Sequence, residues 1–115
     1  LYSEAPRASG TLESHYAPTA KVRLMSHVDW QKALEALGPH TQNLGLWSVE
    51  KPSPELMGGG LFWRAMPANA RQAAHDVFGV LRDFDARGVR TIWIEMPPDT
   101  PDWEGVRDRL QRAAA

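Results

Sequence analysis

Apolar residues recur at strand spacing in four short stretches of the chain. Lys21 to Met25 alternates apolar and charged positions, as a half-buried strand does. The other three stretches are richer in apolar residues, and prolines or glycines interrupt the chain close to most of them. The predicted strands are therefore residues 21–25, 43–49, 61–66 and 91–96.

Helical spacing of apolar residues predicts three helices between and after these strands. Ser26 is placed to cap the first helix, whose buried face would carry Val28, Ala33, Leu34 and Leu37. Asn69 is placed to cap the second and longest helix, which ends near Gly88. The last helix opens at Pro101 and buries Trp103, Val106, Leu110 and Ala113.

The resulting order, β-α-β-β-α-β-α, predicts an α/β domain. It is a three-layer, Rossmann-like domain with a mostly parallel sheet of about four strands and helices on both faces. Right-handed crossovers, together with the family likeness described below, favour a particular strand order. The second and third strands would lie on one side of the first strand, and the fourth on the other.

Composition fits one small domain preceded by a linker. The chain has 115 residues, of which 43% are hydrophobic, so it can fill a single core. Residues 1–20 hold few large aliphatic side chains and no period, as in an extended linker, and residues 21–115 form the domain. The net charge of -1 gives no general attraction to nucleic acid, and the lack of cysteine excludes thiolate chemistry. No apolar run approaches the ~20 residues of a membrane-spanning helix.

The linker carries the most informative motif. Gly10 is followed by His15-Tyr16-Ala17-Pro18, the His-Tyr-Ala-Pro segment. This stretch resembles the interdomain linker of the two-domain L-threonylcarbamoyladenylate synthases, whose first domain is the YrdC-like fold. Ser9 and Thr11 stand where proline and methionine are commoner in that family.

Three further phrases match the C-terminal domain of the same family in the expected order. Leu81-Arg82-Asp83-Phe84-Asp85 resembles the family's Leu-Arg-x-Leu-Asp phrase on a helix. Glu95 ends a strand and is followed by Pro97-Pro98, and residues 108–114 resemble the family's closing phrase. The likeness thus runs over almost the whole chain, which is identified as the linker and C-terminal domain of such a synthase.

The resemblance implies a function for the full-length protein. The enzyme would combine threonine, bicarbonate and ATP, with Mg²⁺, into threonylcarbamoyl-adenylate, which a partner complex uses to modify an adenosine of tRNA. The catalytic YrdC-like domain would precede this chain, and Gly10, His15, Tyr16, Ala17 and Pro18 would belong to a linker that covers its reaction chamber. This fragment would hold no catalytic residue and bind no cofactor of its own, would meet tRNA only indirectly, and would lie in the cytoplasm, away from membranes, with homodimerisation possible.

Other interpretations stay open for the domain itself. Ligands of open α/β sheets gather beyond the carboxyl ends of the strands, so Ser26, Asn69 and Glu95 are candidates for a nucleotide crevice. The domain could then sense a nucleotide, or it could be a protein-interaction module without a ligand. Asp85 could pair with Arg109 or Arg112 if the two helices pack together. The histidines have no spacing that suggests a metal site.

Overall fold

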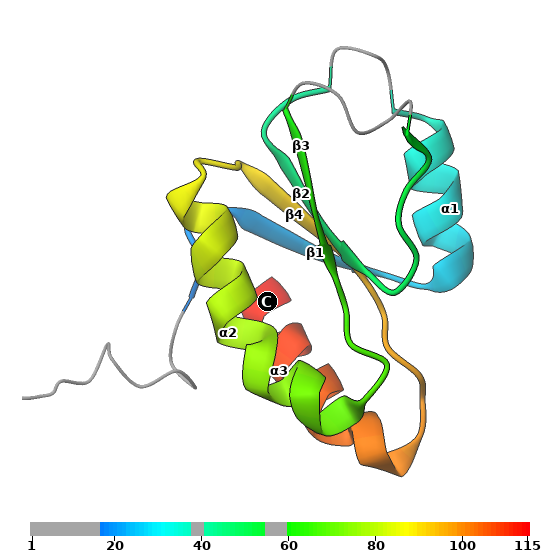
Figure 1. The fold of residues 1–115 in the computed structure, drawn as a ribbon. Helices are drawn as coiled ribbons and strands as arrows, with labels where there is room; N and C mark the ends of the chain where they lie inside the picture. The colour runs from blue at the N-terminus through cyan, green and yellow to red at the C-terminus, as the bar shows by residue number, and fades with distance from the viewer. Residues whose placement is uncertain (1–16, 38–40, 55–59) are drawn as a thin grey trace, which may run out of the picture.

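A computed structural model describes residues 17–37, 41–54 and 60–115 of the chain. These described residues form four strands and three α-helices in the predicted order (Figure 1). The strands are β1 (Lys21–Met25), β2 (Leu44–Ser48), β3 (Leu61–Ala65) and β4 (Thr91–Glu95). The helices are α1 (His27–Glu35), α2 (Ala70–Ala86) and α3 (Glu104–Ala114), the last preceded by a 3₁₀ turn, η4 (Pro101–Trp103).

The four strands form one sheet in which every described pair is parallel. Their order is β1-β4-β2-β3, so the chain crosses the sheet in one direction through α1 and returns through α2. Right-handed crossovers in opposite directions place their helices on opposite faces. Figure 1 shows this arrangement, with α1 on one face and α2 and α3 on the other. The predicted three-layer α/β fold is therefore confirmed.

The predicted strand order is wrong in one respect. β4 does not lie outside β1 but between β1 and β2, which makes β1 an edge strand. The side chains give the reason: Ile92 and Ile94 of β4 are fully buried, whereas Lys21 and Arg23 of β1 are exposed. A central parallel strand is covered on both faces, so the more apolar strand takes the inner place.

The larger part of the core lies between the sheet and α2 with α3. Ile92, Ile94 and Trp47 of the sheet pack there against the apolar faces of the two helices. A Cβ built on Gly45 of β2 would come within 2.9 Å of two ring atoms of Phe84, so glycine allows α2 to lie close to the sheet. Residues buried from these helices are Ala73, Val77, Phe78, Val80, Leu81, Phe84, Val106 and Leu110.

The second cluster lies between the sheet and α1. Trp30 is the α1 residue buried in this cluster and is 3% exposed, whereas Val28 is 58% exposed. The predicted buried face of this helix is thus wrong at Val28, because the bulkier Trp30 takes the core position. Ala33, Leu34 and Leu37 pack partly against the cluster, as predicted.

Two helices begin at the N-terminal capping residues that the sequence predicts. Ser26 accepts a hydrogen bond on its Oγ from the amide of Asp29 at 3.2 Å, and Asn69 accepts one from the amide of Gln72 at 3.0 Å. The start of the last helix differs from the prediction. Pro101 opens the 3₁₀ turn η4, and α3 begins only at Glu104.

Two glycines should respond oppositely to the same substitution. Gly45→Ala is expected to lower the unfolding free energy by about 1–3 kcal/mol, since the new methyl group overlaps the Phe84 ring. Gly79→Ala in α2 is the matched control, because a Cβ there meets nothing within 4 Å. It should raise the unfolding free energy by roughly 0.5–1 kcal/mol through helix propensity. Urea unfolding of the two variants measures both changes, and a stable Gly45→Ala variant would contradict the tight packing of α2.

Candidate functional site

The carboxyl end of the sheet brings two of the three predicted crevice residues into neighbouring positions. Met25 and Glu95 are register partners on β1 and β4, and the amide of Met96 donates to the carbonyl of Met25 at 2.7 Å. Ser26 follows Met25 directly, so Ser26 and Glu95 lie beside each other at this edge. Ser26 uses its hydroxyl to cap α1, as described above.

Glu95 forms an ion pair with His27, in the first turn of α1. The Glu95 side chain is 13% exposed and the His27 side chain 55% exposed. The hydrogen bond and the charge of Glu95 raise the pKa of His27, with a smaller contribution from Glu50. The sequence indicated no partner for His27. His27 comes close to Glu95 because β1 and β4 are adjacent parallel strands. This adjacency could not be predicted without the correct strand order.

Asn69, the third predicted crevice residue, lies on the other face of the sheet. It caps α2 and lines a hollow of about 370 Å³ between this helix and the start of α3, with Asp102 and Gly105 among the other lining residues. Ser26 and Glu95 do not line that hollow. The structure therefore gives two separate places for these three residues, and a nucleotide crevice formed by all of them stays a prediction.

The segment before β1, which the sequence predicts to be the end of a linker, contacts the end of α2. Gly10, His15 and Tyr16 lie outside the described residues; Ala17 is exposed and Pro18 half-buried. The carboxylate of Asp85 accepts hydrogen bonds from the amides of Thr19 at 3.0 Å and Ala20 at 3.2 Å. We call these two bonds the Asp85 clamp.

The sequence suggested an ion pair between Asp85 and Arg109 or Arg112, whereas the bonds described for Asp85 come from backbone amides. Arg112 instead pairs with Asp108 at 3.0 Å within α3. Two backbone amides in succession are good donors to one carboxylate, because each oxygen takes one of them. The clamp links residues 65 and 66 positions apart, so no local pattern in the sequence could have indicated it.

Asp83, two residues before Asp85, makes a second polar contact in another direction. Partial burial raises the pKa of Asp83, but hydrogen bonds from Arg64 at 2.9 Å and Arg87 at 3.3 Å outweigh burial and lower it. The bond from Arg64 ties α2 to the edge strand β3, and the bond from Arg87 is local to the end of α2. The two aspartates therefore have separate structural partners, as their spacing on a helix predicts.

The clamp and the Glu95–His27 pair lie at opposite ends of the sheet. Residues 19 and 20 lead into the first residue of β1, whereas Glu95 ends β4 beside the last residue of β1. A five-residue strand is about 16 Å long. The described end of the linker thus approaches the domain one strand length away from the predicted crevice.

Neither a metal cluster nor a membrane span emerges from the described residues. Within those residues, no three His, Cys, Asp or Glu side chains converge on one point. None of the helices in the described ranges is long and apolar enough to cross a membrane.

Comparison with known protein families gives a match over nearly the whole chain. The family model described as threonylcarbamoyl-AMP synthase, C-terminal domain, matches residues 2–115. No curated protein and no solved structure matches the chain.

The Glu95–His27 pair should make stability depend on pH. Since the pKa of His27 is raised in the folded protein, the pair stabilises fully below the unfolded value of about 6.5 and its contribution is lost as pH rises through the folded pKa. The loss of unfolding free energy on Glu95→Gln should accordingly be larger at acidic than at alkaline pH. An NMR titration should also show the His27 pKa falling in this variant.

Glu35→Gln provides the control for that experiment. It removes a carboxylate from the other end of α1, and Glu35 is not among the groups that shift His27. An unchanged His27 pKa in Glu95→Gln, or an equal fall in Glu35→Gln, would contradict the assignment.

Proposed function

We propose that this chain, which belongs to the family of threonylcarbamoyl-AMP synthase C-terminal domains, is the accessory domain that fixes the linker of such an enzyme over its reaction chamber. In this proposal residues 1–20 are the interdomain linker, residues 21–115 the accessory domain, and a YrdC-like catalytic domain precedes them. That domain would use threonine, bicarbonate and ATP, with Mg²⁺, in a nucleotidyl-transfer reaction.

The Asp85 clamp is the observation that carries this proposal. It holds the chain one residue after the His-Tyr-Ala-Pro segment ends at Pro18. With Thr19 and Ala20 fixed, the segment starts from a defined point on the domain and explores fewer conformations than a free linker. A domain that anchors one end of a lid lowers the entropy lost on closure.

A lid is suited to the chemistry of the product. Threonylcarbamoyl-adenylate is a mixed anhydride, which water attacks readily, and closing a reaction chamber excludes water. His15 and Tyr16 are the proposed lid residues, supported by Gly10, Ala17 and Pro18 in the same motif. The catalytic groups would lie in the upstream domain, and this chain would supply none.

Partners follow from the same assignment. The upstream catalytic domain is the first proposed partner, and a threonylcarbamoyl-transfer complex the second. tRNA would receive the product from that complex rather than from this domain. We propose a cytoplasmic location, since tRNA modification takes place there, and homodimer formation as one further way in which the domain could act.

The test uses the full-length synthase and counts two products. Pyrophosphate release reports each adenylate formed, and AMP release reports each adenylate lost to water. His15→Ala and Asp85→Ala should both raise AMP per pyrophosphate. For Asp85→Ala we expect roughly a tenfold increase, because the clamp contributes on the order of 1.5 kcal/mol to holding the linker.

Asp108→Ala is the matched control for Asp85→Ala. It removes an exposed carboxylate that pairs with Arg112 and contacts no described linker residue. This variant should keep the AMP-to-pyrophosphate ratio of the parent enzyme. Unchanged ratios in His15→Ala would contradict the lid, and an unchanged ratio in Asp85→Ala alone would contradict the clamp's part in it.

A further inference from the structure

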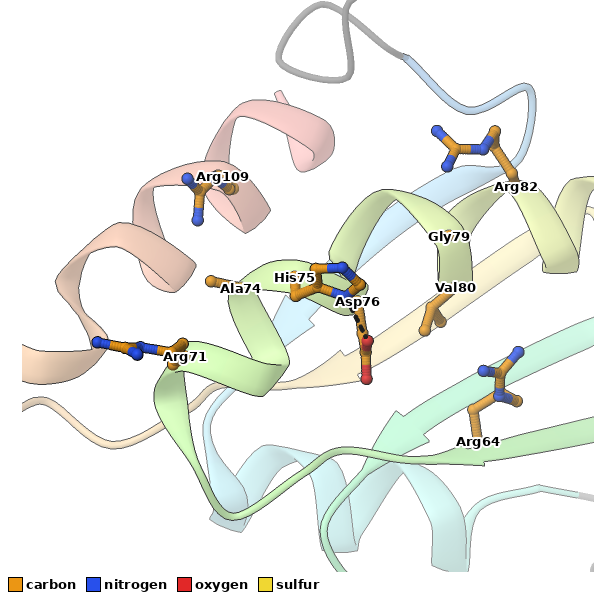
Figure 2. A pocket seen from close by; sticks show the side chains of 9 residues that line it. All are labelled: Arg64, Arg71, Ala74, His75, Asp76, Gly79, Val80, Arg82 and Arg109. Carbon is orange, nitrogen blue, oxygen red and sulfur yellow. Dashed lines mark hydrogen bonds and ion pairs between the residues drawn. The ribbon is translucent and has the colours of Figure 1, made fainter.

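Arginines from three elements surround a hollow over the outer face of α2. Arg71 and Arg82 belong to α2, Arg64 to β3 and Arg109 to α3, and the hollow measures about 590 Å³ (Figure 2). We call it the α2 hollow. It gathers four of the 13 Lys and Arg residues of a chain whose net charge is only -1.

Internal ion pairs leave much of this positive charge available. Arg64 pairs with Asp83, but neither Arg71 nor Arg109 has an ion pair within the described residues. Asp76 is the one carboxylate among the described residues that line the hollow. Gln72 donates to Asp76 at 2.9 Å, and His75 lies 3.3 Å from the same carboxylate oxygen.

Gly79 lies in the middle of this face and has no role in packing. It is exposed in the interior of a 17-residue helix, and a Cβ there would meet nothing within 4 Å. Glycine is among the poorest helix formers, so the fold itself gives no reason for it. A missing side chain between His75 and Arg82 lets another molecule come close to the helix backbone.

The charges and the shape together indicate the chemistry of a ligand. Guanidinium groups bind phosphates with two parallel hydrogen bonds. Arg71 and Arg82 are 11 residues apart, about 16 Å along the helix, which exceeds the reach of one phosphate. Apart from Gly79, Ala74 and Val80 are the apolar lining residues, so little surface is offered to a base or ring.

We propose that the α2 hollow binds a ligand that presents several phosphate groups in a row. Arg71, Arg109 and Arg82 would contact successive phosphates, and Gly79 would allow the ligand to lie against the helix. Such a row occurs in the backbone of a nucleic-acid strand and in a polyphosphate chain. The proposal concerns this domain alone and does not depend on the clamp, the linker or the upstream domain.

The experiment measures binding of a fluorescein-labelled single-stranded RNA of about 20 nucleotides to this chain by anisotropy, at salt concentrations from about 50 to 200 mM. Saturable binding that weakens with salt is expected. The double variant Arg71→Glu/Arg109→Glu should lose at least about tenfold in affinity, with a shallower salt dependence. A carboxylate at position 71 lies in the first turn of α2, where it favours the helix, so this substitution should not unfold the domain.

Arg109→Glu is also measured alone, and its matched control is Arg112→Glu, which makes the same change of two charge units on the same helix, α3, but outside the hollow. The control should bind within about twofold of the parent chain, because its arginine contacts no phosphate in the proposed site. Gly79→Leu should weaken binding about fivefold without changing charge, since its side chain fills the gap between His75 and Arg82.

Tripolyphosphate distinguishes the two sources of phosphate. It is added as a competitor to the RNA complex, and its own binding to the chain is measured by calorimetry without RNA. Displacement of RNA by tripolyphosphate, or binding of tripolyphosphate alone, assigns the hollow to short phosphate chains. RNA binding that resists tripolyphosphate assigns it to a nucleic-acid strand. Failure of both ligands to bind, an equal loss in Arg112→Glu, or unchanged binding in Gly79→Leu would overturn the proposal, while the family assignment would stand.

Discussion

The close packing of Phe84 against Gly45 decides the position of α2 and of everything attached to it. Phe84 is fully buried, and its ring occupies the space that a side chain on β2 would need. Helical geometry then fixes the directions of its two neighbours. Asp83 reaches Arg64 of β3 on one side, and Asp85 reaches the amides of Thr19 and Ala20 on the other. One apolar contact thus positions two polar contacts, one to the sheet edge and one to the linker.

This arrangement places the polar contacts at opposite ends of the sheet. The clamp lies where the chain enters β1, and the Glu95–His27 pair ties α1 to β4 at the carboxyl end of the strands. Helix α2 covers the face of the sheet opposite α1 (Figure 1). Arg107 adds to the rigidity of the carboxyl end, since it donates to the carbonyls of Pro98 and Thr100. The loop after β4 is therefore bound to α3. A rigid frame of this kind is what a linker anchor requires, because a mobile anchor would leave the linker's end undefined.

The elements of this fold could be predicted from local pattern, but their neighbours in the sheet could not. Apolar periodicity and caps at Ser26 and Asn69 placed every strand, α1 and α2 within one or two residues of their observed bounds, whereas α3 begins three residues after its predicted start. The order of strands depends on which strand is buried on both faces. The alternating Lys21 and Arg23 of β1 were a signal for an edge strand, but the predicted order rested on right-handed crossovers and family likeness, which do not show which strand is buried on both faces. In α1, periodicity alone could not show that Trp30 rather than Val28 fills the core.

The candidate sites show the same limit more sharply. The sequence identified the residues of the phrase from Leu81 to Asp85, but the partners of Asp85 come from the distant linker and only the fold brings them together. Glycines illustrate why. Gly45 and Gly79 are alike in the sequence, each within an otherwise regular element, yet the structure gives Gly45 a packing partner and Gly79 none. Gly79 lines the same hollow as Arg71 and Arg109, which have no ion pair within the described residues. The exposed face of α2, rather than its buried face, is therefore where an additional ligand has room to bind.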